Sequence, residues 1–346
     1  MGCWFVKPSE AAQNGKTEAV KYSWDERAKI NPAEFTIDKL KDTTTGRLPG
    51  TVNGQQFVIS NCEDCNIYIF DHCNMVTIDD CCRSNILIGA VKGSIFIRNC
   101  SECKFVLACQ QFRVRDCQKI DVYLSVTTQP IIESSSAVKF ACFSFNYPQL
   151  ENHFRNAGLS EFNNNWNDVH DFTPIEGETN WGFISNDNSA EYTFPLPTTD
   201  ELSDIKISTS PADSFVPHTL GLRRRNSDES CLIVFFNDGQ SHQRAKSFIQ
   251  ALDNSSVTTN LINTKEVSLE ASTAKNIFNS ESYSQVIARG PVIGLEYNGA
   301  DTVRDCQTTA MRIAKESGST GLLYVSSNAT IATKQIETFF NYANMK

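Results

Sequence analysis

The stretch from residue 57 to residue 143 contains five copies of one short sequence repeat, and this repeat decides the fold. Its copies read FVISNCEDCNIYIF (57–70), VTIDDCCRSNILIG (76–89), IFIRNCSECKFVLA (95–108), FRVRDCQKIDVYLS (112–125) and PIIESSSAVKFACF (130–143). The copies align at Cys62, Cys81, Cys100, Cys117 and Ser135, in steps of 19, 19, 17 and 18 residues. A repeat of this length is too short to bury its own apolar face, so the copies are expected to stack.

Each copy predicts two short strands around a polar turn. Apolar residues alternate with polar ones before the turn, as in Phe57 and Ile59, and again after it, as in Ile67 and Ile69. Alternation with a period of two predicts half-buried strands. Stacked units of this kind predict an all-β, right-handed parallel β-helix with the cysteines at an inward corner. The segment from Phe35 to Val52 is expected to supply an earlier, less regular coil.

The same cysteines allow a rival interpretation as zinc ligands. Cys62 and Cys65 form one CxxC pair, and Cys100 and Cys103 form another. In the predicted solenoid the two pairs lie two rungs apart, roughly 10 Å. Zinc–sulfur bonds of about 2.3 Å do not span that distance, so we predict no metal site.

Composition limits the classes of function. The chain has 346 residues, a formal net charge of -9 and 13 cysteines. The acidic balance argues against a protein built to coat nucleic acid. The start lacks the basic and apolar regions of a secretory signal peptide, so an intracellular protein with reduced thiols is expected.

The first residues, Met1-Gly2-Cys3, predict a lipid anchor. After removal of Met1, Gly2 presents an amine for myristoylation and Cys3 a thiol for palmitoylation. Two acyl chains give stable membrane attachment, whereas one gives only weak binding. The usual pattern has Ser or Thr at the sixth position, where this chain has Val6.

The fourth copy places two arginines on the outside of the solenoid. With Phe112 and Val114 inward, Arg113 and Arg115 face outward. Arg113 is expected to share its column with Val58, Thr77, Phe96 and Ile131, and to be the only charge there; Arg115 is expected to lie between Arg98 and Glu133 in an ion-pair ladder. A guanidinium held on a rigid sheet has the chemistry of an arginine finger, which neutralises charge on a transferring phosphoryl group. Glu133, diagonal to Arg113, is expected to orient that guanidinium.

The strings LACQQFRVRDC, NCEDCNIYIFDH, GRLPGTV and TQPIIESSS resemble the tubulin-folding cofactor C domain family. The resemblance implies a GTPase-activating protein for ADP-ribosylation factor-like protein 3 in its GTP state. It implies that Arg113 is the arginine finger and that Gln110, Gln111, Glu133 and Phe172 contact the GTPase. It also implies acylation at Gly2 and Cys3 and a place on the cytoplasmic face of the plasma membrane, near the cilium, in trafficking of lipidated cargo.

No cofactor is expected in this chain, since GTP and Mg²⁺ would belong to the partner GTPase. The chain has no Walker A motif of its own. Two other functions stay open. A non-catalytic effector or scaffold would bind the GTPase without needing Arg113, and a tubulin-folding factor would gain little from a membrane anchor.

From Cys231 onward, strands alternate with helices. Strands are expected at 231–236, 257–262, 291–297 and 321–327, and helices at 242–252, 269–278, 302–317 and 333–343. This order predicts an α/β ferredoxin-like domain that resembles nucleoside diphosphate kinases. Those enzymes use a histidine nucleophile. The last histidine here is His242, in the first helix and without the kinase motif around it, so we predict a structural or docking module.

Four regions are therefore expected. Residues 1–21 form an acylated tether, residues 22–196 the β-helix domain, residues 197–229 a connector and residues 230–346 the α/β domain. The connector contains three successive arginines, Arg223 to Arg225, which are expected to be solvated.

Overall fold

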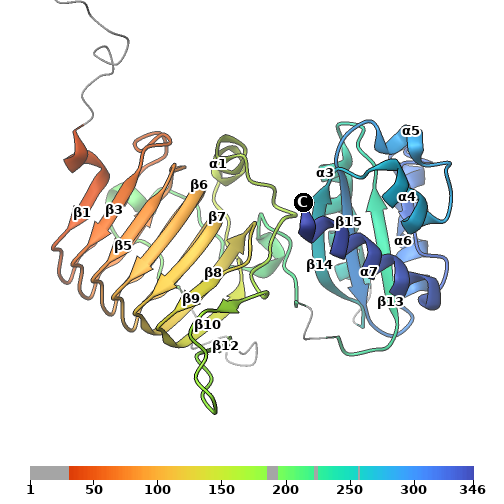
Figure 1. Ribbon diagram of the computed structural model, residues 1–346. Helices are drawn as coiled ribbons and strands as arrows, with labels where there is room; N and C mark the ends of the chain where they lie inside the picture. The colour runs from red at the N-terminus through yellow and green to blue at the C-terminus, as the bar shows by residue number, and fades with distance from the viewer. Residues whose placement is uncertain (1–30, 185–193, 222–224, 256–257) are drawn as a thin grey trace, which may run out of the picture. The chain divides into compact units, whose positions relative to one another are not determined.

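The computed structural model describes residues 31–184, 194–221, 225–255 and 258–346. Residues Phe35–Lys346 form one compact unit. It contains a parallel β-solenoid and a separate four-stranded antiparallel sheet (Figure 1). Short helical turns lie outside both sheets: η1 (Pro32–Phe35), α2 (Asp200–Ser203) and η3 (Pro211–Asp213).

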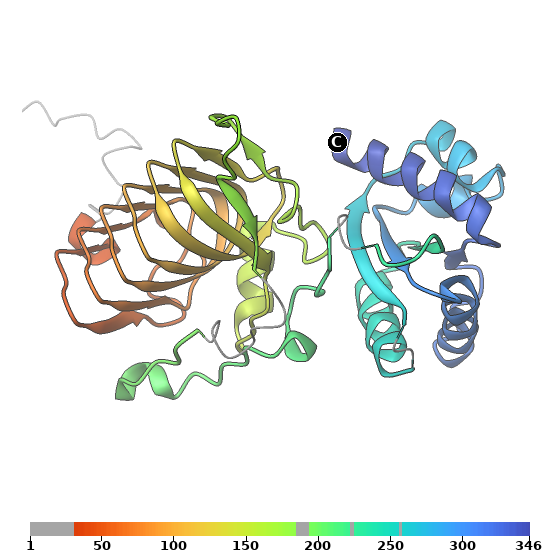
Figure 2. The same ribbon diagram turned by 90° about the horizontal axis from the view of Figure 1, so that it is seen from below.

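The solenoid has two columns of parallel strands, which Figure 2 shows as stacked coils in red to yellow. One column contains β1 (Thr36–Asp38), β3 (Phe57–Ser60), β5 (Val76–Asp79), the second half of β6 (Asn85–Arg98), the second half of β7 (Lys104–Arg115), β9 (Ile131–Glu133) and β11 (His170–Asp171). The other contains β2 (Thr44–Arg47), β4 (Asn66–Ile69), the first halves of β6 and β7, β8 (Gln118–Val126), β10 (Ser136–Cys142) and β12 (Trp181–Phe183).

The predicted β-solenoid is therefore confirmed, together with the earlier coil that β1 and β2 form. The structure adds one rung that the repeat did not predict. After an excursion through α1 (Leu150–Ala157), the chain returns and adds β11 beside β9 and β12 beside β10. The repeat motif is absent from residues 170–183, so periodicity alone gave no signal for this rung.

The polar turns explain why the repeat closes into coils. The residue before each aligned cysteine has a positive φ, between 53° and 54° at Asn61, Asp80, Asn99 and Asp116. Asn and Asp tolerate this left-handed conformation better than other residues with a side chain. The next residue is the buried cysteine, whose thiol donates to the carbonyl two residues earlier, as Cys62 does to Ser60 and Cys100 to Arg98. The turn therefore bends the backbone and satisfies the thiol within one corner.

One prediction about the strands was wrong for part of the solenoid. The first strand of each copy is half-buried, as predicted. The second strand is buried on both faces in the first three copies, and it is half-buried in the fourth and fifth copies. In the first three copies its inward residues, such as Ile67, join the solenoid core. Its outward residues, such as Tyr68 and Leu87, belong to a second core cluster that also contains Leu150 and Phe154 of α1. Alternation cannot distinguish these cases here, because the outward positions are also apolar and their cover comes from elsewhere in the chain.

A buried carboxylate ties two neighbouring coils together. The Asp71 side chain is 1 % exposed and accepts hydrogen bonds from the backbone N–H groups of Val52 (2.7 Å), Asn53 (2.7 Å) and His72 (2.8 Å). Burial by itself raises the pKa of Asp71, but the three N–H donors outweigh it and hold the pKa below its ordinary value. The His153 ring also lies beside the carboxylate, with its Nε2 atom 3.5 Å from Asp71 Oδ1.

The C-terminal part of the chain forms an α/β sandwich. Its elements are β13 (Ser230–Phe235), α3 (Ser241–Ser255), β14 (Asn260–Val267), α4 (Ala271–Phe278), α5 (Ser284–Ile287), β15 (Val292–Asn298), α6 (Thr302–Glu316), β16 (Leu323–Val325) and α7 (Ala329–Met345). The strand order β14-β15-β13-β16 is the antiparallel order of a ferredoxin-like fold, as predicted. Helices α3 and α6 pack on one face of the sheet, and α4 and α7 on the other (Figure 2).

The element limits differ from prediction mainly at the edge strand β14. It begins at Asn260 rather than residue 257, and it continues through the polar residues Asn263 to Glu266. The Asn163 side chain pairs with the backbone N–H and C=O of Glu266, and the Thr264 hydroxyl donates to the Phe162 carbonyl. Tertiary partners therefore satisfy a polar strand that hydropathy indicates as a loop.

Candidate functional site

Arg113 lies on the outer surface of the solenoid, in the column predicted from the sequence. The register pairs Arg113 with Phe96 on one side and Ile131 on the other, and Ile131 in turn with His170. The Arg113 side chain is exposed, and it makes no hydrogen bond or ion pair with any residue in the described ranges. Its backbone is held in two ladders, so the guanidinium stands on a rigid base.

Gln110 and Gln111 precede Arg113 on β7. The Gln110 carbonyl accepts hydrogen bonds from the Thr128 N–H (3.0 Å) and the Thr128 hydroxyl (3.1 Å), while its side chain is exposed. The Gln111 side chain is half-buried and accepts a hydrogen bond from the Ser94 hydroxyl at 3.0 Å. Of the two amides, Gln110 is the more available to a partner.

The predicted ion-pair ladder around Arg115 was wrong in its partners. The register does place Arg115 between Arg98 and Glu133. However, Arg98 binds Asp79 of the preceding rung, with Nε–Oδ1 at 2.7 Å, and Arg115 binds its neighbour Asp116 at 2.9 Å. Within the described ranges Glu133 is exposed and forms no ion pair, so it does not hold the Arg113 guanidinium in the free protein.

Phe172 lies on the rung next to Glu133. Its N–H donates to the Ile132 carbonyl at 3.0 Å, directly after β11, and its side chain is 59 % exposed. The following turn is fixed by Asp171, which accepts hydrogen bonds from the Thr173 N–H and the Asn180 amide. A large aromatic ring on a fixed backbone is the usual anchor of a protein–protein contact.

Sequence reasoning missed two residues beside Phe172. The His170 ring stands edge-on to the Phe172 ring at 4.5 Å between centroids, and Ile175 is 54 % exposed. Both belong to the returning segment, for which the repeat gave no signal. The surface therefore combines an unpaired guanidinium, exposed amide and carboxylate groups, and an apolar rim, which is suited to binding the face of another protein.

Two further predictions concern the ends of the chain and metals. Gly2, Cys3 and Val6 lie outside the described residues. Among the residues that the structure describes, no helix is long and apolar enough to span a bilayer. In the same part of the chain, no group of three or more His, Cys, Asp or Glu residues is arranged to hold a metal ion. The rung that contains Cys81 lies between the rungs of Cys62 and Cys100, so the two CxxC pairs are two rungs apart.

His242 has a structural environment rather than that of a phosphate acceptor. Its Nδ1 contacts Glu161 at 3.1 Å and its Nε2 contacts Glu266 at 2.8 Å. The hydrogen bond to Glu161, with that to Glu266, raises the pKa of His242 to about 10. An imidazolium with both nitrogens engaged has no lone pair for nucleophilic attack. The ring instead links the solenoid's C-terminal extension to α3 and β14.

The fold and this surface define a protein with a cofactor C domain. The family model described as Tubulin binding cofactor C matches residues 54–172, which include β3 to β11 and all five predicted contact residues. The human protein named Tubulin-specific chaperone C is 29 % identical over 43 % of this chain and 44 % of its own length.

Relatives that match the whole chain are more specific. Protein XRP2 of Homo sapiens is 45 % identical over 100 % of this chain and 99 % of its own length. Protein XRP2 of Gallus gallus is 43 % identical, with the same two coverages. The chain belongs to the XRP2 family.

Proposed function

We propose that this protein is a GTPase-activating protein for ADP-ribosylation factor-like protein 3 in its GTP state, with Arg113 as an arginine finger supplied in trans. The observation that carries the proposal is the exposed Arg113 guanidinium, held on a rigid strand and unpaired among the described residues. Membership of the XRP2 family supports the same class of function.

The proposed chemistry is electrostatic. In phosphoryl transfer, negative charge spreads over the γ-phosphate oxygens in the transition state, and a planar guanidinium stabilises it by hydrogen bonds. GTP, Mg²⁺ and the water-orienting residue would belong to the GTPase. In this protein Phe172 and Gln110 would bind the partner's surface, and Glu133 would meet either a partner cation or the Arg113 guanidinium once binding excludes water.

The unpaired state of Arg113 fits this role. An arginine already held by a carboxylate would have to break that contact before reaching the nucleotide. Arg98 and Arg115 are held in this way by Asp79 and Asp116. Arg113 is therefore the arginine of this surface that can enter a partner's active site without losing an ion pair.

Single-turnover GTP hydrolysis by ADP-ribosylation factor-like protein 3 tests the proposal. Arg113→Ala should abolish an acceleration of roughly 10³–10⁵-fold while binding to the GTPase is kept. Arg98→Ala is the matched control, since it removes an exposed arginine one rung away that is already paired with Asp79. Equal acceleration by wild type and Arg113→Ala would refute the finger. Binding without any acceleration by the wild type would indicate an effector instead.

We also propose attachment to the cytoplasmic face of the plasma membrane through acyl chains on Gly2 and Cys3, in the region of the cilium. The sequence Met1-Gly2-Cys3 supports it. Gly2→Ala should move the protein into the soluble fraction of cells, and Cys3→Ser should weaken attachment to that of one acyl chain. If Gly2→Ala stays with the membranes, the anchor lies elsewhere.

A further inference from the structure

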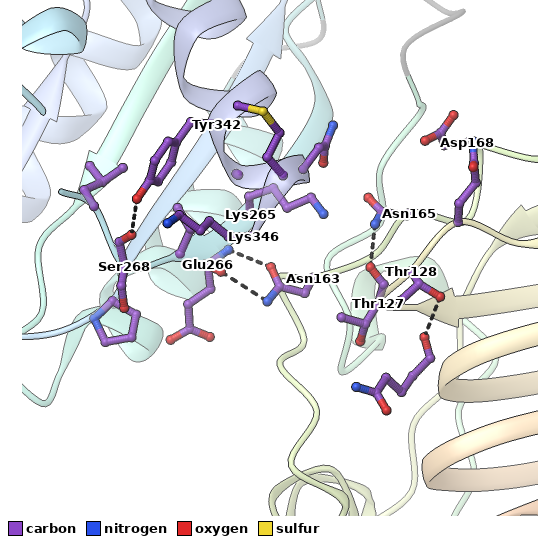
Figure 3. A pocket seen from close by; sticks show the side chains of 18 of the residues that line it. Thr127, Thr128, Asn163, Asn165, Asp168, Lys265, Glu266, Ser268, Tyr342 and Lys346 are labelled. Carbon is purple, nitrogen blue, oxygen red and sulfur yellow. Dashed lines mark hydrogen bonds between the residues drawn. The ribbon is translucent and has the colours of Figure 1, made fainter. Parts of the chain in front are cut away.

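A cavity of about 1030 Å³ lies where the solenoid's last turns meet the α/β domain (Figure 3). From the solenoid side it is lined by Gln110, the turn 127–129 and the segment containing Asn163, Asn165 and Asp168. From the other side it is lined by β14, residues 265–267, and the end of α7, residues 342–345. Its volume is at the upper end of the range for small-molecule sites.

Lys265 is the unusual residue of this cavity. Its side chain is only 5 % exposed, and it has no hydrogen bond or ion pair with any residue in the described parts of the chain. Burial lowers the pKa of Lys265 to about 8, although the charge of Asp168 acts in the opposite direction. Figure 3 shows the side chain extending from β14 toward Asn165 and Asp168. Buried ammonium groups are normally paired at contact distance, whereas among the described residues no carboxylate forms an ion pair with this one.

The other charged groups of the cavity are already engaged. The Glu266 carboxylate accepts hydrogen bonds from the Ser160 hydroxyl and the His242 ring, and Glu270 binds Lys346 at 2.9 Å. Asp168 remains as the one acidic side chain lining the cavity whose carboxylate forms no hydrogen bond or ion pair in the described ranges, although its charge acts on Lys265 from a distance.

Several polar side chains that line the cavity already donate hydrogen bonds to backbone carbonyl groups. The Tyr342 hydroxyl donates to the Ser268 carbonyl, the Asn165 amide to the Thr127 carbonyl and the Thr128 hydroxyl to the Gln110 carbonyl. The Lys265 ammonium, with three N–H donors and no acceptor, is therefore the one cationic group lining the cavity that forms no ion pair among the described residues.

We propose that the cavity is a binding site for a small oxyanion, a carboxylate or phosphate group, that pairs with the Lys265 ammonium. The remaining volume would hold the organic part of such a ligand. Asp168 would face the ligand on its other side and favour one that also carries a hydrogen-bond donor. The site is independent of the proposed GTPase activation, although Gln110 borders both surfaces.

Ligand-induced stabilisation of the full chain tests this site. Inorganic phosphate and succinate are titrated separately at constant ionic strength, and the melting temperature is followed. Because a ligand that binds only the folded state raises the melting temperature, a saturable rise is expected with at least one probe. The probe that acts identifies the source as phosphate or carboxylate. In Lys265→Met, which keeps the length of the side chain, the apparent affinity for that probe should fall at least tenfold.

Lys275→Met is the matched control, because Lys275 lies on α4 and binds Glu281 outside the cavity. It should respond as the wild type does. A response that is unsaturable, absent with both probes, or unchanged in Lys265→Met would overturn the proposal. A second measurement does not depend on the variant's stability: after reductive ¹³C-methylation, the NMR titration midpoint of Lys265 should rise with the active probe. An unchanged midpoint would also overturn the proposal.

Discussion

Replacing the buried carboxylate of Asp71 by an amide should strongly destabilise the solenoid. In the wild type, Oδ2 accepts two backbone N–H groups, from Val52 and Asn53, and Oδ1 accepts one, from His72. An asparagine has one oxygen only. Its best orientation keeps that oxygen on the two donors and turns its NH₂ group toward the N–H of His72, which places two donors against each other.

The magnitude follows from these contacts. A hydrogen bond to a charged group contributes about 1.5–3 kcal/mol, and a neutral one about 0.5–1.5 kcal/mol. Asp71→Asn loses one charged bond, about 1.5–3 kcal/mol, and converts two others to neutral bonds, about 1–1.5 kcal/mol each. A loss of about 3.5–6 kcal/mol in the free energy of unfolding is therefore expected. Against a typical total of about 5–15 kcal/mol, this loss is large.

Urea denaturation followed by far-UV circular dichroism measures the loss. Asp79→Asn is the matched control, because Asp79 lies in the same solenoid but binds only the exposed Arg98, in a pair worth about 0–1 kcal/mol. Since the folded pKa of Asp71 lies below its ordinary value of 3.8, its contribution is present above that pH and is lost as the pH falls through the folded pKa. Equal losses in the two variants would refute the reasoning.

Three further predictions concern stability and reactivity. The folded pKa of His242 is about 10, against an ordinary 6.5. The wild type should therefore be more stable than His242→Gln by a constant amount below pH 6.5, and this difference should vanish as the pH rises through 10. A difference in urea midpoints that does not depend on pH would contradict this. Gly89→Ala places Cβ 2.5 Å from the Asp71 carbonyl oxygen and should lower stability by about 1–3 kcal/mol, whereas Gly182→Ala, with no atom within 4 Å, should change it little; thermal melts compare them. Burial raises the pKa of Cys103 to about 12, so mass spectrometry should find iodoacetamide on half-buried Cys82 well before Cys103, and equal labelling would be the opposing result.

The amino-acid sequence determined the solenoid and its outward columns. A repeat of 17–19 residues with aligned cysteines and period-two alternation has one compact solution, so the neighbours of Arg113 at Phe96 and Ile131 followed from counting. The order of strands and helices after Cys231 likewise predicted the antiparallel sheet. In both cases the deciding interactions are local or recur at a fixed spacing.

Tertiary structure decided what depends on contacts without a period. The return of residues 170–183 to the solenoid, the cover that α1 gives to the second strands, and the burial of Lys265 without an ion pair among the described residues all follow from long-range packing. The sequence records which side chains are charged, but the energy of a charge depends on its burial and on the partners within a few ångströms. Only the folded chain sets those two quantities.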